Sequence, residues 1–220
     1  MATSKKEAMV RGRNFFFFLA AVGAVFGQTP GEKLPGEDWM SLFNGKDLTG
    51  WVKVGNENWA VDEGSIHGQG VTQEYGYLRT EKMYKDFHLF LRFKCEAPGN
   101  SGVFFHTDFQ LNTSRVIRGL QFEIDGHINR HTGGVYGDGR GWIVWPAPEN
   151  ETVLRPHEWN EFLLMVVGNR YISRLNGVLM VDFTDPSPKS FDGYIAFQLH
   201  SGGEGNMRFK DVYIRDLSRR

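Results

Sequence analysis

The stretch RGLQFEIDGH, residues 118–127, decides the fold class of this chain. Its apolar residues Leu120, Phe122 and Ile124 alternate with Gln, Glu and Asp at positions 121, 123 and 125. Because side chains of a β-strand alternate between two faces, one face of this strand is apolar and the other carries three hydrogen-bonding groups. The run predicts a strand with one face in a hydrophobic core and a row of amide and carboxylate groups on the other.

Short runs of the same kind recur along the chain and are separated by turn residues. Examples are DFHLFLRFKCEA, SGVFFHT, EWNEFLLMVV and GYIAFQLH. In GNRYISRLNGVLMVDF, the pair Asn176-Gly177 predicts the tip of a hairpin. From Trp39 onward no capped stretch with the 3.6-residue period of an amphipathic helix is found. Many short strands at this spacing predict an all-β fold, a two-sheet sandwich or jelly roll.

The apolar positions of the clearest strands are predicted to fill the core between the two sheets. Cys95 shares their face and is expected to act as a small buried apolar residue. The predicted core residues are Leu89, Leu91, Phe93, Leu120, Phe122, Ile124, Phe197 and Leu199.

The first 37 residues have the composition of a targeting segment. Lys5, Lys6, Arg11 and Arg13 precede an apolar run from Phe15 to Phe26, and the small Gly27 follows. This order predicts a secretory signal peptide over 1–27, then a polar linker over 28–37 and one domain over 38–220. The apolar run is shorter than the roughly 20 residues of a membrane span, so no stable membrane insertion is expected after cleavage. An uncleaved anchor is the alternative.

Charge and cysteine content limit the class of protein further. The whole chain has a net charge of −1, and residues 1–27 contain four bases and one acid, so the domain carries about −4 (−1 − 3). No basic patch remains, and nucleic acid is therefore not an expected partner. The single cysteine excludes an intramolecular disulfide. Export without disulfides fits a secreted protein of a bacterial periplasm or cell surface.

Several strands place polar side chains opposite their apolar positions. If those strands are neighbours in one sheet, its polar face forms a site with aromatic rings among the polar groups. Carboxylates, amides and Arg bind hydroxyl groups, and flat rings stack on sugar rings, so the pattern predicts a carbohydrate site. The alternative is an ordinary solvated face. The residues gathered in this way would be Arg92, His106, Gln121, Glu123, Asp125, Gln198 and His200.

The long connection over residues 138–157 contains Trp142 and Trp145 and is expected either to form the rim of a site or to cover a sheet edge. A metal held by Asp125, His127 and His131 is a further alternative, although their spacing matches no strong metal signature. No cofactor is predicted.

The order PGNSGVFFH, RGLQFEID, TGGVYG, GYIAFQLHSGG and RFKDVYIRDL resembles one family, the 3-keto-disaccharide hydrolase domain. The resemblance covers about Leu42 to Leu217. It implies a concanavalin A-like jelly roll of the lectin and glucanase type. It also implies an enzyme that breaks down glycosides previously oxidised to a ketone at carbon 3, a keto-sugar substrate class.

A ketone at carbon 3 acidifies the proton on carbon 2, and removal of that proton allows the group on carbon 1 to leave before water adds. For this chemistry we expect Glu123 as the base, Arg92 as the group that stabilises the enolate, and His200 or His106 as the acid. Many family members have Glu and Gln in the opposite order on the central strand, which leaves the base position open. The residues expected to bind and orient the sugar are Asn100, Gln121, Asp125, Tyr136, Trp142 and Gln198.

Two other functions are weighed against this one. A non-catalytic, lectin-like carbohydrate-binding module would use the same polar face without proton transfer. A laminarinase-type glycosidase would need two glutamates on one strand face, but His127 stands where the second would be. The sequence does not indicate the oligomeric state.

Overall fold

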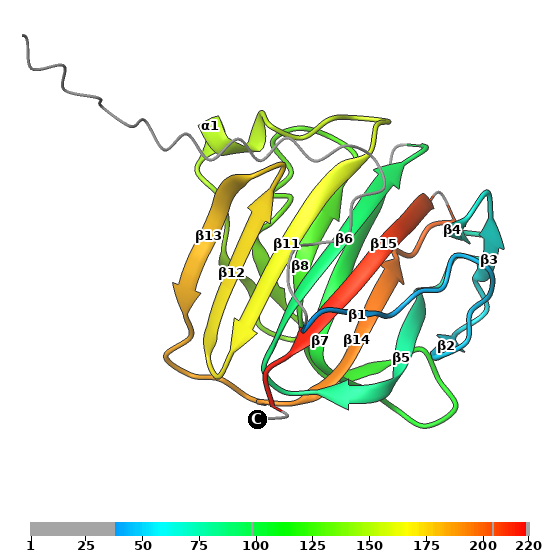
Figure 1. The fold of residues 1–220 in the computed structure, drawn as a ribbon, viewed down its shortest axis with the longest axis horizontal. Coiled ribbons are helices and arrows are strands. Elements are labelled where there is room, and N and C mark those ends of the chain that lie inside the picture. Colours follow the sequence, from blue (N-terminus) through cyan, green and yellow to red (C-terminus); the bar gives the residue numbers. More distant parts are fainter. Residues whose placement is uncertain (1–37, 98, 204, 219–220) are drawn as a thin grey trace, which may run out of the picture. The chain divides into compact units, whose positions relative to one another are not determined.

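The computed structural model describes residues 38–97, 99–203 and 205–218, which form two antiparallel sheets (Figure 1). The expected signal peptide and linker, residues 1–37, lie outside the described residues. Within these ranges the one helix is the single turn α1, Pro148–Glu151. No helix of the described part is long and apolar enough to cross a membrane. The all-β prediction is confirmed.

The first sheet has eight strands in the described part of the chain. A short strand, β1, pairs with β15 beside the main path of this sheet. In spatial order the main path is β13 (Val178–Thr184), β12 (Arg170–Leu175), β11 (Asn160–Val167), β6 (Phe87–Cys95), β15 (Asn206–Asp216), β4 (Ser65–Gln69) and β3 (Asn58–Asp62), and β1 is Met40–Ser41.

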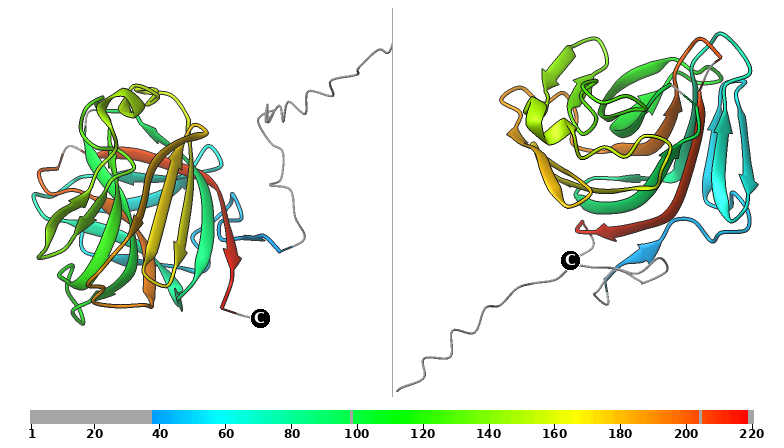
Figure 2. Two further views of the ribbon diagram at one scale, coloured as in Figure 1. Left: turned by 90° about the vertical axis from the view of Figure 1, so that its left-hand side faces the viewer. Right: turned by 90° about the horizontal axis from the view of Figure 1, so that it is seen from above.

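The second sheet has seven strands among the described residues, and β8, the strand of the opening stretch, lies inside it. The two sheets pack face to face, as the turned views in Figure 2 show. In spatial order its strands are β10 (Gly141–Val144), β9 (Val135–Gly137), β8 (Val116–Asp125), β7 (Asn100–Phe109), β14 (Gly193–Leu199), β5 (Gly76–Tyr84) and β2 (Trp51–Val54).

The core lies between the apolar faces of the two sheets, and every predicted core residue belongs to it. Phe197 of the seven-stranded sheet stacks on Phe209 of the eight-stranded sheet with 4.2 Å between ring centroids. Burial of one such side chain contributes about 1.5–3 kcal/mol. Cys95 is buried in the same cluster, and this burial raises the pKa of its thiol to about 12. Since the apolar faces meet, the two polar faces point in opposite directions.

Two local features depart from regular strands. The β12–β13 hairpin turns at Asn176 and Gly177, whose φ angles of 50° and 86° are those that a type I′ turn requires, so the predicted tip is confirmed. In β7 the register shifts between Phe105 and Asp108, and His106 there has a φ of 48°. A bulge of this kind turns the following side chains away from the regular alternation.

Candidate functional site

The outer face of the seven-stranded sheet carries rows of polar and aromatic side chains that cross several strands. In one row, Trp142 of β10 pairs with Tyr136 of β9, Tyr136 with Gln121 of β8, and Gln121 with Phe104 of β7. Directly opposed residues in antiparallel strands point to the same face, so these four side chains lie side by side.

The next two rows along the strands carry the groups that can exchange protons. Glu123 of β8 is opposite Gly102 of β7, and Gln198 of β14 is opposite Tyr77 of β5. One step further, Asn100 begins β7, and its carbonyl oxygen accepts a hydrogen bond from the backbone N–H of His200 at 3.3 Å.

These rows form the wall of a cavity of about 680 Å³, a size typical of small-molecule sites. The structure brings most of the predicted site residues together here. The predicted residues that line the cavity are Asn100, Gln121, Glu123, Tyr136, Trp142, Gln198 and His200.

Glu123 lies deep in this cavity, with 3% of its surface exposed. Its carboxylate accepts hydrogen bonds from the side-chain amides of Asn100 and of Gln121, the latter at 2.9 Å. Burial raises the pKa of Glu123 to about 8; the hydrogen bond from Asn100 opposes the rise and the charge of Asp125 adds to it. A carboxyl group with this pKa can take up or release a proton near neutral pH, as a general base or acid must.

Three side-chain amides around Glu123 keep a free acceptor. Within the described residues, no hydrogen-bond partner is found for Oδ1 of Asn100 or Oε1 of Gln121 and Gln198. Gln121 and Gln198 are 6% and 4% exposed. Buried acceptors without a partner are uncommon in folded proteins, and three of them around one carboxyl group mark this face as a candidate site.

The absence of a side chain at Gly102 makes room for this arrangement. A Cβ atom there would lie 2.5 Å from Oε1 of Gln121. The glycine between Ser101 and Val103 therefore lets Gln121 lie across β7 and reach the carboxylate of Glu123. The NSG sequence at positions 100–102 is part of the site for this steric reason.

His200 follows β14 and contacts Tyr75 at the mouth of the cavity. The Tyr75 hydroxyl is 3.1 Å from Nε2 of His200, and Nδ1 of the same ring is 3.0 Å from the carbonyl oxygen of Ser201. A carbonyl oxygen can only accept, so Nδ1 carries the hydrogen and, in the neutral ring, Nε2 accepts the phenolic hydrogen.

Arg92 is not in this cavity, contrary to the expectation from the sequence. It lies in β6, a strand of the eight-stranded sheet, and points to that sheet's outer face. There it forms ion pairs with Glu161 at 2.7 Å and Asp211 at 3.0 Å. Arg92 does lie opposite the apolar face of β6, but the alternation within a strand does not determine to which sheet that strand belongs.

His106 also lies outside the cavity, because of the bulge in β7. Regular alternation from Gly102 would bring it to the cavity face, but its positive φ turns the ring inward, where it is 1% exposed. Its Nε2 donates to the carbonyl oxygen of Lys85 at 2.8 Å, and burial lowers the pKa of the ring.

Asp125 lies one row beyond Glu123 and lines a smaller adjoining cavity of about 280 Å³. Its Oδ1 accepts the backbone N–H of His127 at 2.8 Å and lies 2.9 Å from Nδ1 of that ring. His131 pairs instead with Glu151 at 2.9 Å. The three residues considered for a metal do not converge, and no cluster of three or more potential metal ligands is found in the described part of the chain.

The connection over 138–157 lies along one side of the cavity and also provides an edge strand of the sheet. Its strand β10 is the last strand of the seven-stranded sheet and carries Trp142. The Trp142 ring meets Tyr136 edge to face at 5.5 Å and Trp145 at 6.5 Å. Trp145 is exposed and lies beyond the cavity-lining residues. The connection thus lines one side of the cavity through Trp142 and also supplies the outermost strand of this sheet.

Several residues of the cavity were not anticipated from the sequence. Tyr75 and Tyr77 alternate around Gly76 at the start of β5, a pattern that could have placed both on one face. Arg115 and Asp138 come from loops beside β8 and β9, and strand alternation gives no signal for loop residues. Burial raises the pKa of Asp138, while the charge of Arg115 lowers it.

Comparison with known proteins places the chain among carbohydrate-active proteins. Residues 38–215 match the model of a family described as the 3-keto-alpha-glucoside-1,2-lyase-like domain. A comparison with curated proteins finds no significant match.

Solved structures share the fold. A Parabacteroides distasonis protein named as a candidate glycosyl hydrolase is 25% identical, with a TM-score of 0.65 over 82% of this chain and 94% of its own. A second such protein from the same organism is 22% identical, with a TM-score of 0.60 over 81% of this chain and 99% of its own. The carbohydrate binding module CBM66 from Bacillus subtilis is 15% identical, with a TM-score of 0.57 over 76% of this chain and 96% of its own. The fold is thus one found in carbohydrate-binding domains.

Proposed function

The chain belongs to the 3-keto-alpha-glucoside-1,2-lyase-like domain family, and from this we propose that it cleaves the bond between a 3-keto sugar and the group on its carbon 1. The observation that carries the proposal is Glu123, a buried carboxyl group with its pKa raised to about 8 in a cavity of sugar size. A binding module has no need of a group poised to exchange protons, whereas removal of a proton from carbon 2 requires one.

The proposed reaction begins with the Glu123 carboxylate taking the proton from carbon 2. The electrons of the C–H bond form an enolate with the carbon 3 ketone. As the ketone re-forms, a double bond appears between carbons 1 and 2, and the leaving oxygen departs with the electrons of its bond to carbon 1. The oxygen of water then adds to carbon 1, its released proton goes to the leaving oxygen, and Glu123 returns its proton to carbon 2.

The amides around Glu123 hold the sugar in this proposal. The free oxygens of Asn100, Gln121 and Gln198 accept hydrogen bonds from its hydroxyl groups, and the rings of Tyr136 and Trp142 form a wall for its apolar face. This fixed geometry matters because proton transfer at carbon requires close alignment of base and substrate.

The negative charge on the enolate oxygen needs a donor other than Arg92. Of the described residues that line the cavity, Arg115 is the one arginine, and there is no lysine among them. We therefore propose that Arg115, and not Arg92, stabilises the enolate. A guanidinium group can reach over the cavity from the loop before β8 and donate to the developing charge.

The test compares oxidised and unoxidised sugars on the purified protein. We expect 3-keto-trehalose or a methyl 3-keto-glucoside to be cleaved and the unoxidised sugars to be left intact. Glu123→Gln should lower turnover by about 10² to 10⁴, the usual contribution of a general base. A lectin-like module would bind the unoxidised sugar as well and show no turnover, and that outcome would reject the proposal.

We also propose that the protein is exported after removal of residues 1–27. The order of basic, apolar and small residues at the start supports this. Mass spectrometry of the native protein should find an N-terminus near Gln28; a terminus at Met1 on a cytosolic protein would contradict it.

A further inference from the structure

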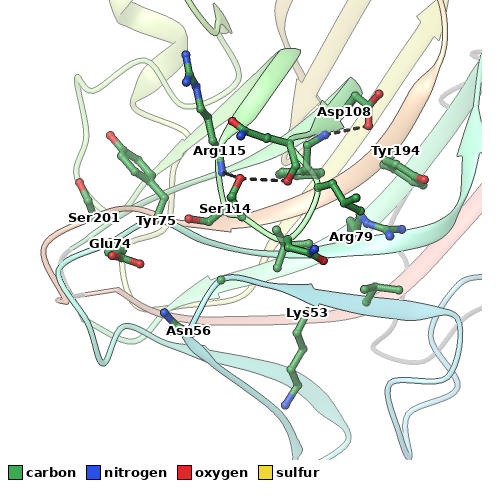
Figure 3. Close-up of a pocket in the computed structure, with 18 of the residues that line it drawn as sticks. Lys53, Asn56, Glu74, Tyr75, Arg79, Asp108, Ser114, Arg115, Tyr194 and Ser201 are labelled. Carbon is green, nitrogen blue, oxygen red and sulfur yellow. Dashed lines mark hydrogen bonds between the residues drawn. The ribbon is translucent and has the colours of Figure 1, made fainter.

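A second and larger cavity of about 1070 Å³ adjoins the one that contains Glu123. The two cavities share Tyr75, Ser114 and Arg115 as lining residues. Figure 3 shows Tyr75 at one end of the larger cavity, with Arg79 and Tyr194 at the other. A group attached to a sugar in the first cavity can therefore extend across this boundary into the larger one.

The size of the larger cavity favours it as the place for the attached group. The cavity that contains Asp125, at about 280 Å³, is slightly smaller than the range of about 300–1,000 Å³ common for ligand pockets, whereas the larger cavity slightly exceeds it and has room for a second sugar. Its end opposite Tyr75 holds Arg79, whose guanidinium group stacks 4.0 Å from the centre of the Tyr194 ring (Figure 3). A guanidinium group and an aromatic ring together offer hydrogen-bond donors and a stacking surface to a second polyol.

The hydroxyl of Tyr75 lies at the boundary between the two cavities. Tyr75 is 38% exposed, and its ring contacts the His200 ring at 4.7 Å. The loop before it is held by buried Glu57, whose carboxylate accepts hydrogen bonds from the backbone N–H of Val71 and of Thr72. This loop sits close against Glu57, because a Cβ on Gly76 would lie 2.4 Å from Cγ of Glu57. The backbone on both sides of Tyr75 is therefore held against Glu57, and the Tyr75 hydroxyl lies 3.1 Å from Nε2 of His200.

Resting on the proposed function, we propose that the keto sugar binds beside Glu123, the leaving group binds in the larger cavity, and Tyr75 protonates the leaving oxygen. In the elimination step, the bond between carbon 1 and the leaving oxygen breaks, and that oxygen takes both bonding electrons and the phenolic proton of Tyr75. The resulting tyrosinate takes a proton from the water that adds to carbon 1. Glu123 returns its proton to carbon 2, so both residues regain their starting states and one water is consumed.

His200 acts on the reaction through Tyr75, as a positioning residue. In its neutral form it holds the phenolic hydrogen at Nε2. The phenolic O–H can rotate about its C–O bond, which turns the hydrogen from Nε2 toward an oxygen bound in the cavity. His200 therefore holds Tyr75 at the place from which it delivers its proton.

The test uses two substrates whose leaving groups differ in their need for a proton. A 3-keto disaccharide expels an alkoxide, which requires an acid, whereas a 4-nitrophenyl 3-keto-glucoside expels a stable phenolate, which does not. Tyr75→Phe should lower kcat about 10²-fold or more on the disaccharide and change it little on the aryl glucoside. Tyr136→Phe removes a hydroxyl from the same cavity away from the boundary and should affect both substrates equally.

Equal losses on both substrates in Tyr75→Phe, or no loss on either, would overturn the assignment of Tyr75. A wild-type protein inactive on both substrates would instead reject the proposed function itself, so the two failures are distinguishable. For the placement of the leaving group, Arg79→Met should raise KM for the disaccharide and leave KM for methyl 3-keto-glucoside unchanged. An equal change for both would exclude the larger cavity.

Discussion

At the scale of single residues, the environment of Glu123 combines two opposed influences on one carboxyl group. Burial disfavours its charged form, and the amide hydrogens of Asn100 and Gln121 favour it. The result is a pKa of about 8, far above the value near 4.5 of an exposed glutamate. The charged form, which is the base in the proposed reaction, is thus available near neutral pH and is more basic than an exposed carboxylate.

The pH dependence of cleavage should report this value. If Glu123 is the base, kcat/KM rises as the pH increases through about 8, because the free enzyme must lose the proton of Glu123 to become active. Initial rates at low substrate concentration between pH 5 and 10 measure this profile. A rate that is already constant from pH 5 upward would show that the carboxyl group is not the titrating base.

At the scale of the elements, the site depends on how β7 and β8 lie against each other. The side chains of Glu123 and Gln121 can meet because the residue of β7 opposite Glu123 is Gly102, which has no side chain to occupy the space between them. Two residues before it, Asn100 has a side chain that donates to the same carboxylate. The bulge further along β7 removes His106 from the face. One strand thus contributes an amide, an open space and a deviation from regular alternation.

The substitution Gly102→Ala tests the need for this open space. Its Cβ would lie 2.5 Å from Oε1 of Gln121, so the amide must move and its hydrogen bond to Glu123 weakens. We expect kcat to fall about 10-fold or more, because Glu123 would no longer be held in its position. We also expect the free energy of unfolding to fall by about 1–3 kcal/mol, because the added methyl group overpacks the site. Steady-state kinetics and urea unfolding measure the two effects.

Gly177→Ala provides a matched control at the tip of the β12–β13 hairpin. Its φ of 86° makes alanine costly there by about 1–2 kcal/mol, and no atom within 4 Å would be displaced. This variant should lose comparable stability and keep full activity. A similar loss of kcat in both variants would attribute the effect of Gly102→Ala to stability alone.

At the scale of the whole domain, the packing of the two sheets separates a stabilising face from a functional face. The inner faces bury the large aromatic core, including Phe197 and Phe209. The outer face of the eight-stranded sheet carries ion pairs such as Arg92 with Glu161. The outer face of the seven-stranded sheet instead buries Glu123. Because the pKa of this carboxyl group is higher in the folded than in the unfolded chain, it lowers the stability of the fold at any pH at which Glu123 of the unfolded chain is ionised.

The free energy of unfolding should show this cost when wild type and Glu123→Gln are compared across pH. The folded protein keeps the proton of Glu123 up to about pH 8, while the unfolded chain loses it near 4.5. Between these values the folded state binds more protons, so wild-type stability falls by about 1.4 kcal/mol per pH unit relative to the variant, which does not titrate there. The advantage of Glu123→Gln should grow from pH 4.5 to 8 and then level off.

Chemical denaturation at several pH values measures this difference. Gln at this position keeps one acceptor, and the amides of Asn100 and Gln121 can rotate to present their free oxygens to its NH₂ group. A difference between the two proteins that does not change with pH would show that the pKa of Glu123 is not raised in the folded state.

The sequence by itself determined the fold class, the core and the strand that carries Glu123. The alternation of Leu120, Phe122 and Ile124 with Gln121 and Glu123 is a property of the chain alone, because a strand fixes the side on which each residue lies. The same holds for the turn at Asn176-Gly177, where the residue types set the backbone angles.

Only the tertiary structure decided which polar faces meet. Arg92 and Glu123 both lie opposite apolar residues in their strands, yet they point away from each other because their strands belong to different sheets. The bulge in β7 turns His106 away from the site, whereas Tyr75 and Arg115 line the site from loops. Sheet membership, bulges and loop positions depend on contacts between residues far apart in the sequence, and local alternation contains no information about those contacts.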